Sequence, residues 1–450
     1  MLLASAGVAV FCVGRPRTPP SILLITLDTT RADRLGAYGY RGAATPRLDR
    51  LAREGVLFER AVTAAPITLP AHVSLFTGAY PFAHGVRNNG NFSLGETTPT
   101  LTTALHDRGY RTAAFVSAFV LDRRYGLARG FDEYDDHVQL ERRGDRTAAA
   151  AGAWLDAQAH EPAPFFVWLH LYDPHDPYDP PPPFREAFAA SAYDGEIAFT
   201  DQVVGSVLDR LDRIGRLSST IVAVIGDHGE SLGEHGEDTH AVFVYESTLR
   251  VPMILAWPGH LPAAARVSAL VRAIDLAPTL LDLAGLPPLG GAQGRTLGPL
   301  VDRRAGAVSP ASAYAESYFP LFSMEVTQLS LAVQDQSKLR MKCDVGLVHE
   351  FDQLDLGCAI EIILINEQGL GNFKLPGFSV ENVDRVSCLA RRDDLHIRPR
   401  TDRFRHRQTR ALAANADEDL RFLVRKSCPV GRRWRRDGTF TRKTLNDDTR

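Results

Sequence analysis

The sequence predicts an α/β protein in which helices cover both faces of one doubly wound, mostly parallel sheet, in three α/β/α layers, with a smaller C-terminal α+β part. Several short apolar runs have the length and the Ile, Leu and Val content of buried strands. Segments with helical periodicity separate these runs, and polar residues directly follow two of them. Alternating strands and helices favour parallel pairing, because parallel strands need a long crossover connection.

The first expected strand is 21–26, SILLIT, which is rich in Ile and Leu and ends two residues before Asp28. Pro46 then begins a helical stretch in which Leu48 and Leu51 share one face, and Gly55 ends it. A longer helix is expected over 195–213. Further buried strands are expected at 112–116, 164–169, 220–225 and 252–256.

The pattern changes after residue 298. The stretch 314–341 can supply antiparallel strands, and LSLAVQDQSKLRM within it is typical of a hairpin. Beyond Cys358 the hydrophobic periodicity becomes irregular. We therefore expect four parts: a signal-like or anchor segment at 1–19, a catalytic domain at 20–315, a small C-terminal subdomain at 316–390 and a basic, poorly ordered tail at 391–450.

Charge is distributed unevenly along the chain. The formal net charge is -3, but 391–450 carry 18 Lys and Arg against 9 Asp and Glu, which leaves -12 for 1–390. The tail segments RFRHRQTR and VGRRWRRDG resemble patches that bind nucleic acid or membrane surfaces. A solvated tail is the simpler interpretation, so we expect no nucleic-acid partner. The oligomeric state does not follow from the sequence.

The N-terminal run LLASAGVAVFCV, at 2–13, is too short to span a bilayer as a helix but long enough for the apolar part of a signal sequence. We expect an exported protein, either periplasmic or associated with the membrane through this N-terminus. A cytoplasmic protein in which this run forms a buried strand is the alternative.

Acidic residues follow two of the expected strands. Asp28 follows the first, and Asp227 and His228 follow the strand at 220–225. The carboxyl ends of parallel strands meet at one edge of a sheet, so these residues should lie close together. A divalent cation held there by carboxylate and imidazole would activate a hydroxyl and polarise an ester at once.

A hydroxyl suited to that role is Thr68, in the segment TLPAHVSLFTG. Pro70 indicates that a helix begins near Thr68. The exposed N–H groups and the positive end of the dipole at a helix N-terminus favour an anion. A negatively charged ester group would therefore bind beside Thr68.

The segment ITLPAHVSLFTGAYP, at 67–81, resembles the sulfatase nucleophile signature Cys-x-Pro-Ser-Arg-x-x-Leu-x-Thr-Gly with its first residue changed. The resemblance spans roughly residues 20 to 300 and includes TPRLDRLAREGVLF, STLRVPMIL, DLAPTLLDLAGLP and QGRTL. It implies a member of the sulfatase family, within the alkaline phosphatase superfamily. Such a member would have an alkaline-phosphatase-like fold and would be a metal-dependent hydrolase of phosphate or sulfate esters.

The resemblance also assigns roles at the expected metal centre. Asp28, Asp227 and His228 take the metal-ligand positions, and Thr68 contacts the same ion as the nucleophile. His72 occupies the position of the signature Arg, which braces the nucleophile in sulfatases.

Further positions would contact the substrate. Asn89, in HGVRNNG, matches an asparagine that binds a nonbridging oxygen in related phosphonate and phosphodiester hydrolases. His175, in the family's PHxP loop, and His240 are the candidate general acids, although the Ala after His240 stands where a Gly is expected. His84 and His235 are expected to be structural.

Two departures from the family bear on the substrate. Thr68 replaces the Cys that sulfatases convert to formylglycine, so a metal-activated hydroxyl must attack instead. The sulfate-binding stretch Gly-Lys-Trp-His-Leu-Gly is replaced by SAFVLDRRYG, which has neither the Lys nor the His. A sulfated threonine lacks the elimination route of a formylglycine hydrate. We therefore expect phosphate monoesters, diesters or phosphonates to be favoured over sulfate esters.

Another departure bears on the metal. The usual first Asp pair is Asp28-Thr29 here, and the usual Asp-Asn of the second cluster is Asp227-His228. Imidazole in place of an amide oxygen shifts the preference from Ca²⁺ toward Zn²⁺ or Mn²⁺, with Ca²⁺ as the alternative. The substrate would be a small molecule, or an ester group on a glycan or lipid.

Two other functions remain as alternatives. A transferase of the phosphoethanolamine or phosphoglycerol type uses a related Thr and metal, but such enzymes generally carry several membrane helices, whereas only about a dozen apolar residues precede Ser21. An inactive homologue could retain the fold and bind anionic partners. The retention of Asp28, Thr68, Asp227 and His228 argues against that alternative.

Overall fold

The structure is a computed structural model. It describes residues 19–302 and 312–319, and the main chain of short strands at 328–334, 338–344, 358–359, 387–388, 432–434 and 440–442. The expected signal-like segment lies outside the described residues, apart from Pro19. Most of the expected C-terminal subdomain and basic tail lies outside them as well.

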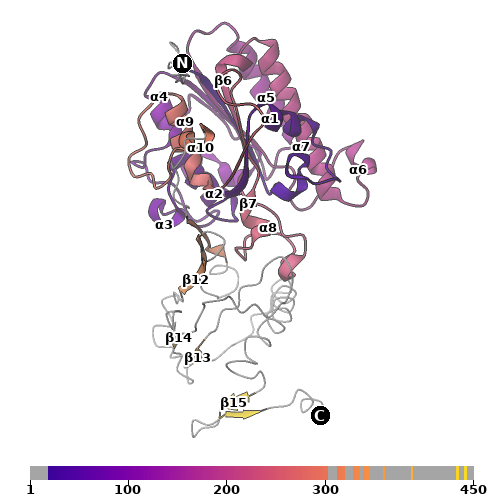
Figure 1. The fold of residues 1–450 in the computed structure, drawn as a ribbon, viewed down its shortest axis with the longest axis vertical. Helices are drawn as coiled ribbons and strands as arrows, with labels where there is room; N and C mark the ends of the chain where they lie inside the picture. The colour runs from indigo at the N-terminus through magenta and orange to yellow at the C-terminus, as the bar shows by residue number, and fades with distance from the viewer. Residues whose placement is uncertain are drawn as a thin grey trace, which may run out of the picture. The chain divides into compact units, whose positions relative to one another are not determined.

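One nine-stranded sheet forms the centre of the part that was expected to be catalytic (Figure 1). Its order is β4-β3-β5-β1-β6-β8-β2-β7, and β9 pairs with β2. The strands are β1 (Ser21–Leu27), β2 (Val56–Val62), β3 (Arg111–Phe115), β4 (Glu133–Asp135), β5 (Phe165–Leu171), β6 (Thr220–Gly226), β7 (Arg250–Val251), β8 (Met253–Ala256) and β9 (Ala265–Arg272).

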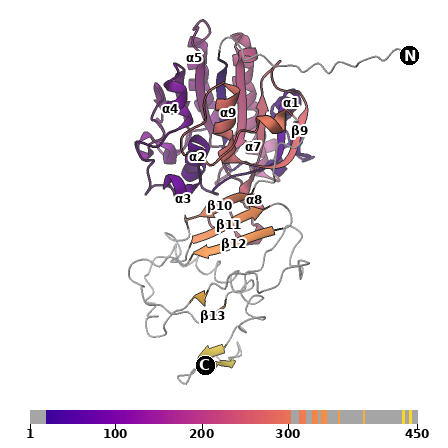
Figure 2. The ribbon, with the colours of Figure 1, turned by 60° about the vertical axis from the view of Figure 1, so that its left-hand side comes forward.

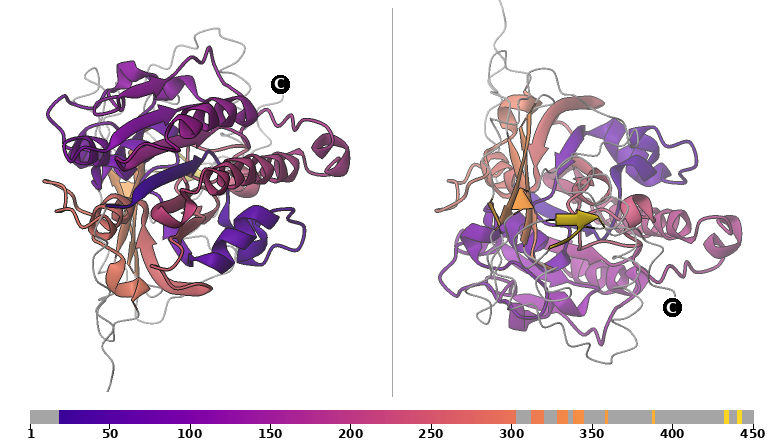
Figure 3. Two further views of the ribbon diagram at one scale, coloured as in Figure 1. Left: turned by 90° about the horizontal axis from the view of Figure 1, so that it is seen from above. Right: turned by 90° about the horizontal axis from the view of Figure 1, so that it is seen from below.

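Helices cover both faces of this sheet (Figure 1), and α5 and α7 lie side by side (Figure 3). They are α1 (Pro46–Glu54), α2 (Thr68–Thr77), α3 (Pro81–His84), α4 (Leu101–His106), α5 (Gly144–Ala157), α6 (Phe184–Ala187), α7 (Ala192–Arg213), α8 (Glu246–Leu249), α9 (Leu276–Leu283) and α10 (Gly298–Val301). Short 3₁₀ helices occupy 32–34, 36–38, 119–121, 123–125, 217–219, 234–236 and 273–275.

The two faces of the sheet bury separate hydrophobic clusters, because successive strand side chains point to opposite faces. In β1, Ile22 and Leu24 join the cluster formed with α2, α4, α9 and α10. Leu23 and Ile25 join the cluster formed with α1, α5 and α7. The expected α/β/α arrangement is therefore confirmed.

Pairing within the sheet is mostly parallel, as expected. The strands from β4 through β3, β5 and β1 to β6 are all parallel. The strand expected at 252–256 is present as β8, but it runs antiparallel to β6 and β2. Two strands were not predicted from the apolar runs of the sequence. Strand β2 carries Glu59 and Arg60 at its centre, and buried and exposed positions alternate in the eight-residue strand β9.

A small sheet follows the catalytic core in the chain (Figure 2). Strand β10 (Ala313–Ser317) pairs antiparallel with β11 (Gln328–Gln334), and β12 (Lys338–Asp344) follows β11 in the same sheet. These strands occupy the stretch from which antiparallel strands were predicted. Two short antiparallel pairs also occur, β13 (Cys358–Ala359) with β14 (Ser387–Cys388), and β15 (Arg432–Trp434) with β16 (Phe440–Arg442).

Candidate active site and metal centre

The candidate site lies at the carboxyl ends of the three central strands β5, β1 and β6. Asp28 follows β1 directly, and Asp227 follows β6 directly. Parallel register aligns Leu27 with Gly226, so the two aspartates leave adjacent strands at the same level. The same register aligns Thr26 of β1 with His170 of β5. All of these side chains are buried.

His228 presents an unprotonated nitrogen to this cluster. Its Nδ1 lies 3.0 Å from the carbonyl oxygen of Gly229, which can only accept, so Nδ1 carries the proton. Burial and the neighbouring charge of His240 lower the pKa of His228 to about 3, so the ring is neutral near pH 7. Its Nε2 lies 3.5 Å from Asp28 Oδ1 and 3.6 Å from Asp227 Oδ2.

Both of these buried carboxylate oxygens lack a hydrogen-bond partner among the described residues. Burial and the adjacent charge of Asp28 raise the pKa of Asp227 far above its usual range. Burial also disfavours ionisation of Asp28, but the hydrogen bond from His170 and the neighbouring imidazoles outweigh it and hold the pKa of Asp28 low. A buried, unpaired carboxylate is costly, and a cation between these oxygens would remove that cost.

Thr68 completes this cluster from the other side of the sheet edge. It is the first residue of α2, as predicted, and follows Ile67, which has extended backbone angles. Its side chain is 3 % exposed, and Oγ1 lies 3.4 Å from His228 Nε2. His228 Nε2 therefore lies within 3.6 Å of three oxygens, which are Asp28 Oδ1, Asp227 Oδ2 and Thr68 Oγ1.

His72 contacts Thr68 through the main chain. Its Nδ1 lies 2.7 Å from the Thr68 carbonyl oxygen and 3.5 Å from Asp227 Oδ2, so Nδ1 carries the proton. Its Nε2 accepts a hydrogen bond from the Thr26 hydroxyl, which accepts one in turn from the Trp168 indole. Burial and the nearby His170 lower the pKa of His72 to about 3.

Sequence reasoning missed His170. It lies inside the apolar strand β5, and its only sequence signal is a polar residue between Leu169 and Leu171. The main-chain N–H of Ser117 donates to its Nδ1 at 3.2 Å, so Nε2 carries the proton and donates to Asp28 Oδ2 at 3.2 Å.

Two groups of side chains in the described part of the chain have the spacing of metal ligands. They are Asp28, Asp227 and His228, and His72, His170 and Asp227. In the second group both imidazoles already use both ring nitrogens in hydrogen bonds. The first group, with its two unpartnered oxygens and one lone pair, therefore fits a divalent cation, and the second group orients it.

The two expected general acids, His240 and His175, lie together on the outer side of His228. The His240 ring centroid is 4.5 Å from that of His228 and 5.1 Å from that of His175. His175 stacks on Tyr172, and its Nδ1 donates to the carbonyl oxygen of Asp176 at 2.7 Å.

Glu230 orients the His240 ring through a hydrogen bond. The His240 Nδ1 lies 3.1 Å from Glu230 Oε1, so it donates to this carboxylate. Burial opposes a charge on His240, but the hydrogen bond and the negative charge of Glu230 outweigh it and raise the pKa of His240. Glu230 is fully buried and was not predicted from the sequence.

Asn89 lies at the N-terminus of α2. Its side-chain oxygen accepts a hydrogen bond from the Leu69 N–H at 2.9 Å, so this half of the amide caps the helix. The two histidines expected to be structural have structural partners. His84 bonds Ser74 and Val86, and His235 stacks on Tyr245 at 4.0 Å.

The stretch SAFVLDRRYG, which replaces the family's sulfate-binding segment, contains two arginines that form ion pairs with aspartates. Arg123 pairs with Asp136 at 2.6 Å, and Arg124 pairs with Asp122 at 2.9 Å. Both guanidinium groups are exposed.

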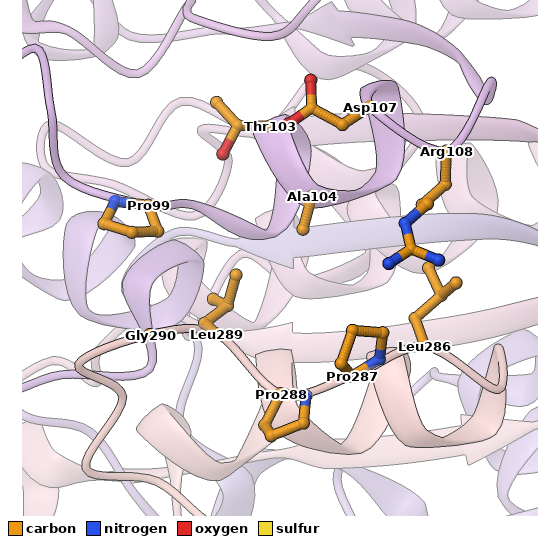
Figure 4. Close-up of a pocket in the computed structure, with 10 residues that line it drawn as sticks. All are labelled: Pro99, Thr103, Ala104, Asp107, Arg108, Leu286, Pro287, Pro288, Leu289 and Gly290. Atoms are coloured by element: carbon orange, nitrogen blue, oxygen red, sulfur yellow. The ribbon is translucent and has the colours of Figure 1, made fainter.

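A pocket of about 250 Å³ lies elsewhere on the catalytic part, between α4 and the segment after α9 (Figure 4). Pro99, Asp107 and Arg108 line one side, and Leu286 and Pro288 line the other. Arg108 precedes the start of β3 by three residues, so this side lies toward the amino ends of the parallel strands. The pocket is therefore not part of the metal site.

The site combines carboxylates and an imidazole with a hydroxyl at a helix N-terminus, all at the carboxyl edge of an α/β/α sheet. This combination is typical of metal-dependent ester hydrolases. The chain belongs to the sulfatase family: the family model for sulfatases matches residues 20–286. A model described as N-sulphoglucosamine sulphohydrolase, C-terminal, matches residues 233–341.

Among curated proteins, the chain is 27% identical over 335 residues to an ulvan-active sulfatase of Formosa agariphila, a match that covers 63% of this chain and 65% of the relative. It is 26% identical over 348 residues to an N-acetylgalactosamine-6-sulfatase of Canis lupus familiaris, which covers 64% and 66%. The chain therefore spans slightly less than two thirds of the length of these relatives.

Solved structures share the fold. The phosphonate monoester hydrolase of Agrobacterium radiobacter has a TM-score of 0.63 at 21% identity, over 72% of this chain and 89% of that one. Ps i-CgsB in complex with k-i-k-neocarrahexaose has a TM-score of 0.62 at 21% identity, over 72% and 86%. In the part of the chain that the structure describes, no helix is both long enough and apolar enough to cross a membrane.

Proposed function

We propose that this protein is a metal-dependent hydrolase of ester groups in which Thr68 is the nucleophile, with phosphoesters favoured over sulfate esters. The proposal rests on the position of His228 Nε2. This nitrogen lies close to Thr68 Oγ1 and to the unpartnered oxygens of Asp28 and Asp227. Nothing in the packing of the core requires these polar groups to meet. Their meeting at the positive end of α2 suits an anionic substrate.

Asp28, Asp227, His228 and Thr68 would hold the ion. The neutral imidazole of His228 favours Zn²⁺ or Mn²⁺, and Ca²⁺ is the weaker candidate. A bound divalent cation would offset the two carboxylate charges and lower the pKa of the Thr68 hydroxyl.

The protein groups then have separate tasks. The N–H half of the Asn89 side-chain amide, whose oxygen accepts from the Leu69 N–H, would contact a nonbridging oxygen of the ester at the positive end of α2. Thr68 Oγ1 would release its proton to solvent water and attack in line, so that the bond between Oγ1 and phosphorus forms while the bond to the leaving oxygen breaks. His240 or His175 would give that oxygen a proton, and water would then hydrolyse the phosphorylated Thr68.

The preference for phosphorus rests on the second half of this cycle. A sulfated threonine has no neighbouring hydroxyl on the same carbon, so it cannot eliminate sulfate as a formylglycine hydrate can. A phosphorylated threonine can be hydrolysed by attack of water at phosphorus. A sulfate ester on a glycan is the second candidate, because the curated relatives include an ulvan-active sulfatase, an N-acetylgalactosamine-6-sulfatase, a steryl-sulfatase and an arylsulfatase.

A substrate panel tests the proposal. Aryl phosphate monoesters, diesters, phosphonates and sulfates are assayed with Zn²⁺, Mn²⁺ and Ca²⁺. We expect phosphoester turnover to exceed sulfate turnover, and we expect Thr68→Ala to abolish both. Thr68→Ser keeps a hydroxyl and is the matched control, so it should retain turnover. A Thr68→Ala variant as active as the wild type would exclude the nucleophile, and faster sulfate turnover would reverse the substrate order.

The same assay separates the remaining alternatives. Transfer of the group to a lipid acceptor, with no release to water, would favour a transferase. Absence of both turnover and bound metal would favour an inactive homologue. Export to the periplasm or attachment to a membrane stays a proposal, because it depends on residues 1–18, which are outside the described part of the chain.

A further inference from the structure

Thr29, the residue that follows Asp28, has an unusual backbone conformation. Its φ is +46°, and its side chain is fully buried. A β-branched residue rarely adopts the left-handed region, so surrounding groups must hold it there. This conformation sets the direction in which the chain leaves the candidate metal ligand.

The group that holds it is the phenol of Tyr193, from the first turn of α7. Its hydroxyl donates to the Thr29 carbonyl oxygen at 2.7 Å and accepts from the Arg31 N–H at 3.0 Å. One hydroxyl therefore closes the turn on both sides of Thr30. Tyr193 is 2 % exposed, so water does not compete for these bonds.

The other side of Asp28 is fixed independently. The Asp28 N–H donates to the Leu171 carbonyl oxygen of β5 at 2.9 Å, as a continuation of the sheet. The sheet thus fixes the chain up to Asp28. The turn after it is held by Tyr193 and by the Thr30 hydroxyl, which donates to the Asp28 carbonyl oxygen at 3.1 Å. Tyr193 also packs edge-on against Tyr178, at 5.4 Å between ring centroids.

We infer that Tyr193 is a positioning residue for the metal site: it holds Thr29 in its strained conformation and so aims the Asp28 carboxylate at the ion. The inference rests on the proposed function, in which Asp28 is a metal ligand. Tyr193 itself does not touch the substrate or the ion. Loss of a group that orients a metal ligand commonly weakens metal binding 10–100-fold.

The chain offers a matched control at the opposite end of the same strand. Tyr110 is also buried, and its hydroxyl donates to the Pro20 carbonyl oxygen at 2.9 Å, just before β1 begins. Tyr110→Phe and Tyr193→Phe therefore each remove a buried hydroxyl that donates to a main-chain carbonyl next to β1. Only Tyr193→Phe affects the end that carries Asp28.

The test is the affinity of the metal-free full-length protein for Mn²⁺, measured by calorimetric titration, with thermal unfolding of each variant recorded alongside. We expect Tyr193→Phe to weaken Mn²⁺ binding by roughly 10–100-fold, and Tyr110→Phe to leave it within about twofold of the wild type. Equal losses in the two variants would overturn the inference.

A double variant removes the strain at Thr29 as well as the Tyr193 hydroxyl. Glycine adopts positive φ freely, so Thr29→Gly combined with Tyr193→Phe should recover most of the Mn²⁺ affinity. No recovery in a folded double variant would count against Tyr193 acting through Thr29. Asp28→Asn tests the proposed metal site separately from the role of Tyr193. If Asp28→Asn binds Mn²⁺ as tightly as the wild type, the proposed metal site itself is wrong.

Discussion

The buried histidines beside the site differ in which nitrogen carries a proton, because each has a different partner. Carbonyl oxygens fix the proton of His72 and His228 on Nδ1, and a main-chain N–H fixes that of His170 on Nε2. Only His228 is left with a lone pair that faces the carboxylates. At the proposed metal site, one of these three side chains would bind the ion and the other two would orient its ligands.

Glu196 of α7 is another buried acidic residue, and its effect on stability should depend on pH. It is 5 % exposed, and its Oε1 accepts from the Asp179 N–H in the loop that carries His175. Burial raises the pKa of Glu196 to about 8 from an ordinary value of 4.5. The folded state therefore holds a proton that the unfolded state releases above pH 4.5, so this residue lowers stability as pH rises from 4.5 to 8.

We predict that Glu196→Gln, which keeps the acceptor oxygen, removes this pH dependence. The variant should match the wild type near pH 4.5 and be more stable by about 4 kcal/mol near pH 8. Urea unfolding of both proteins at several pH values measures the difference, and other titrating groups cancel because both proteins contain them. A difference that stays constant between pH 5 and pH 8 would show that Glu196 is already ionised in the folded protein.

At the scale of the element, the loop from β6 to α8 shows why a glycine was expected after His240. Ala241 has a φ of +84°, a region that glycine occupies without a steric cost. The Ser317 hydroxyl of β10 donates to the Ala241 carbonyl oxygen. The loop thus has the backbone shape that favours glycine, although its sequence has alanine there.

We predict that Ala241→Gly stabilises the protein by about 1 kcal/mol, because relief of the strain exceeds the added entropy of the unfolded chain. The control is Ala149→Gly, at an exposed position in the middle of α5, which should cost about 1 kcal/mol. Opposite signs in thermal unfolding are the expected result. Destabilisation by both changes would mean that Ala241 is not strained.

At the scale of the whole molecule, the candidate metal site joins β1, β6 and α2, which are far apart in the sequence. Two buried carboxylates that repel each other should weaken the metal-free fold. A ligand that binds only the folded state stabilises it by mass action. Metal content and global stability should therefore change together.

We predict that removal of the ion with a chelator lowers the melting temperature, and that added Mn²⁺ or Zn²⁺ restores it. The stabilisation should be about 3–4 kcal/mol at 100 to 1,000 times the dissociation constant. Asp227→Asn, which removes one charge of the pair, should show a smaller response to metal and a more stable metal-free form. An unchanged melting temperature in the wild type would argue against an ion at this site.

The sequence by itself determined the fold class and the chemical groups of the site. The apolar runs that became β1, β3, β5 and β6 have no other stable place than the middle of a sheet covered on both faces. Parallel strands then bring the residues after β1 and β6 to one edge, so the proximity of Asp28, Asp227 and His228 was predictable. The helix that begins at Thr68 was predictable from Pro70.

Only the tertiary structure decided how these groups are held. No sequence pattern singles out the polar residues His170, Glu230 and Tyr193. Each of them acts through a hydrogen bond to a residue in another segment, namely Asp28, His240 and Thr29 in turn. The direction of β8 and the hydrogen bond from Leu69 to Asn89 depend on the same kind of contact. Local patterns encode burial and periodicity, whereas proton positions and backbone strain depend on which groups meet after folding.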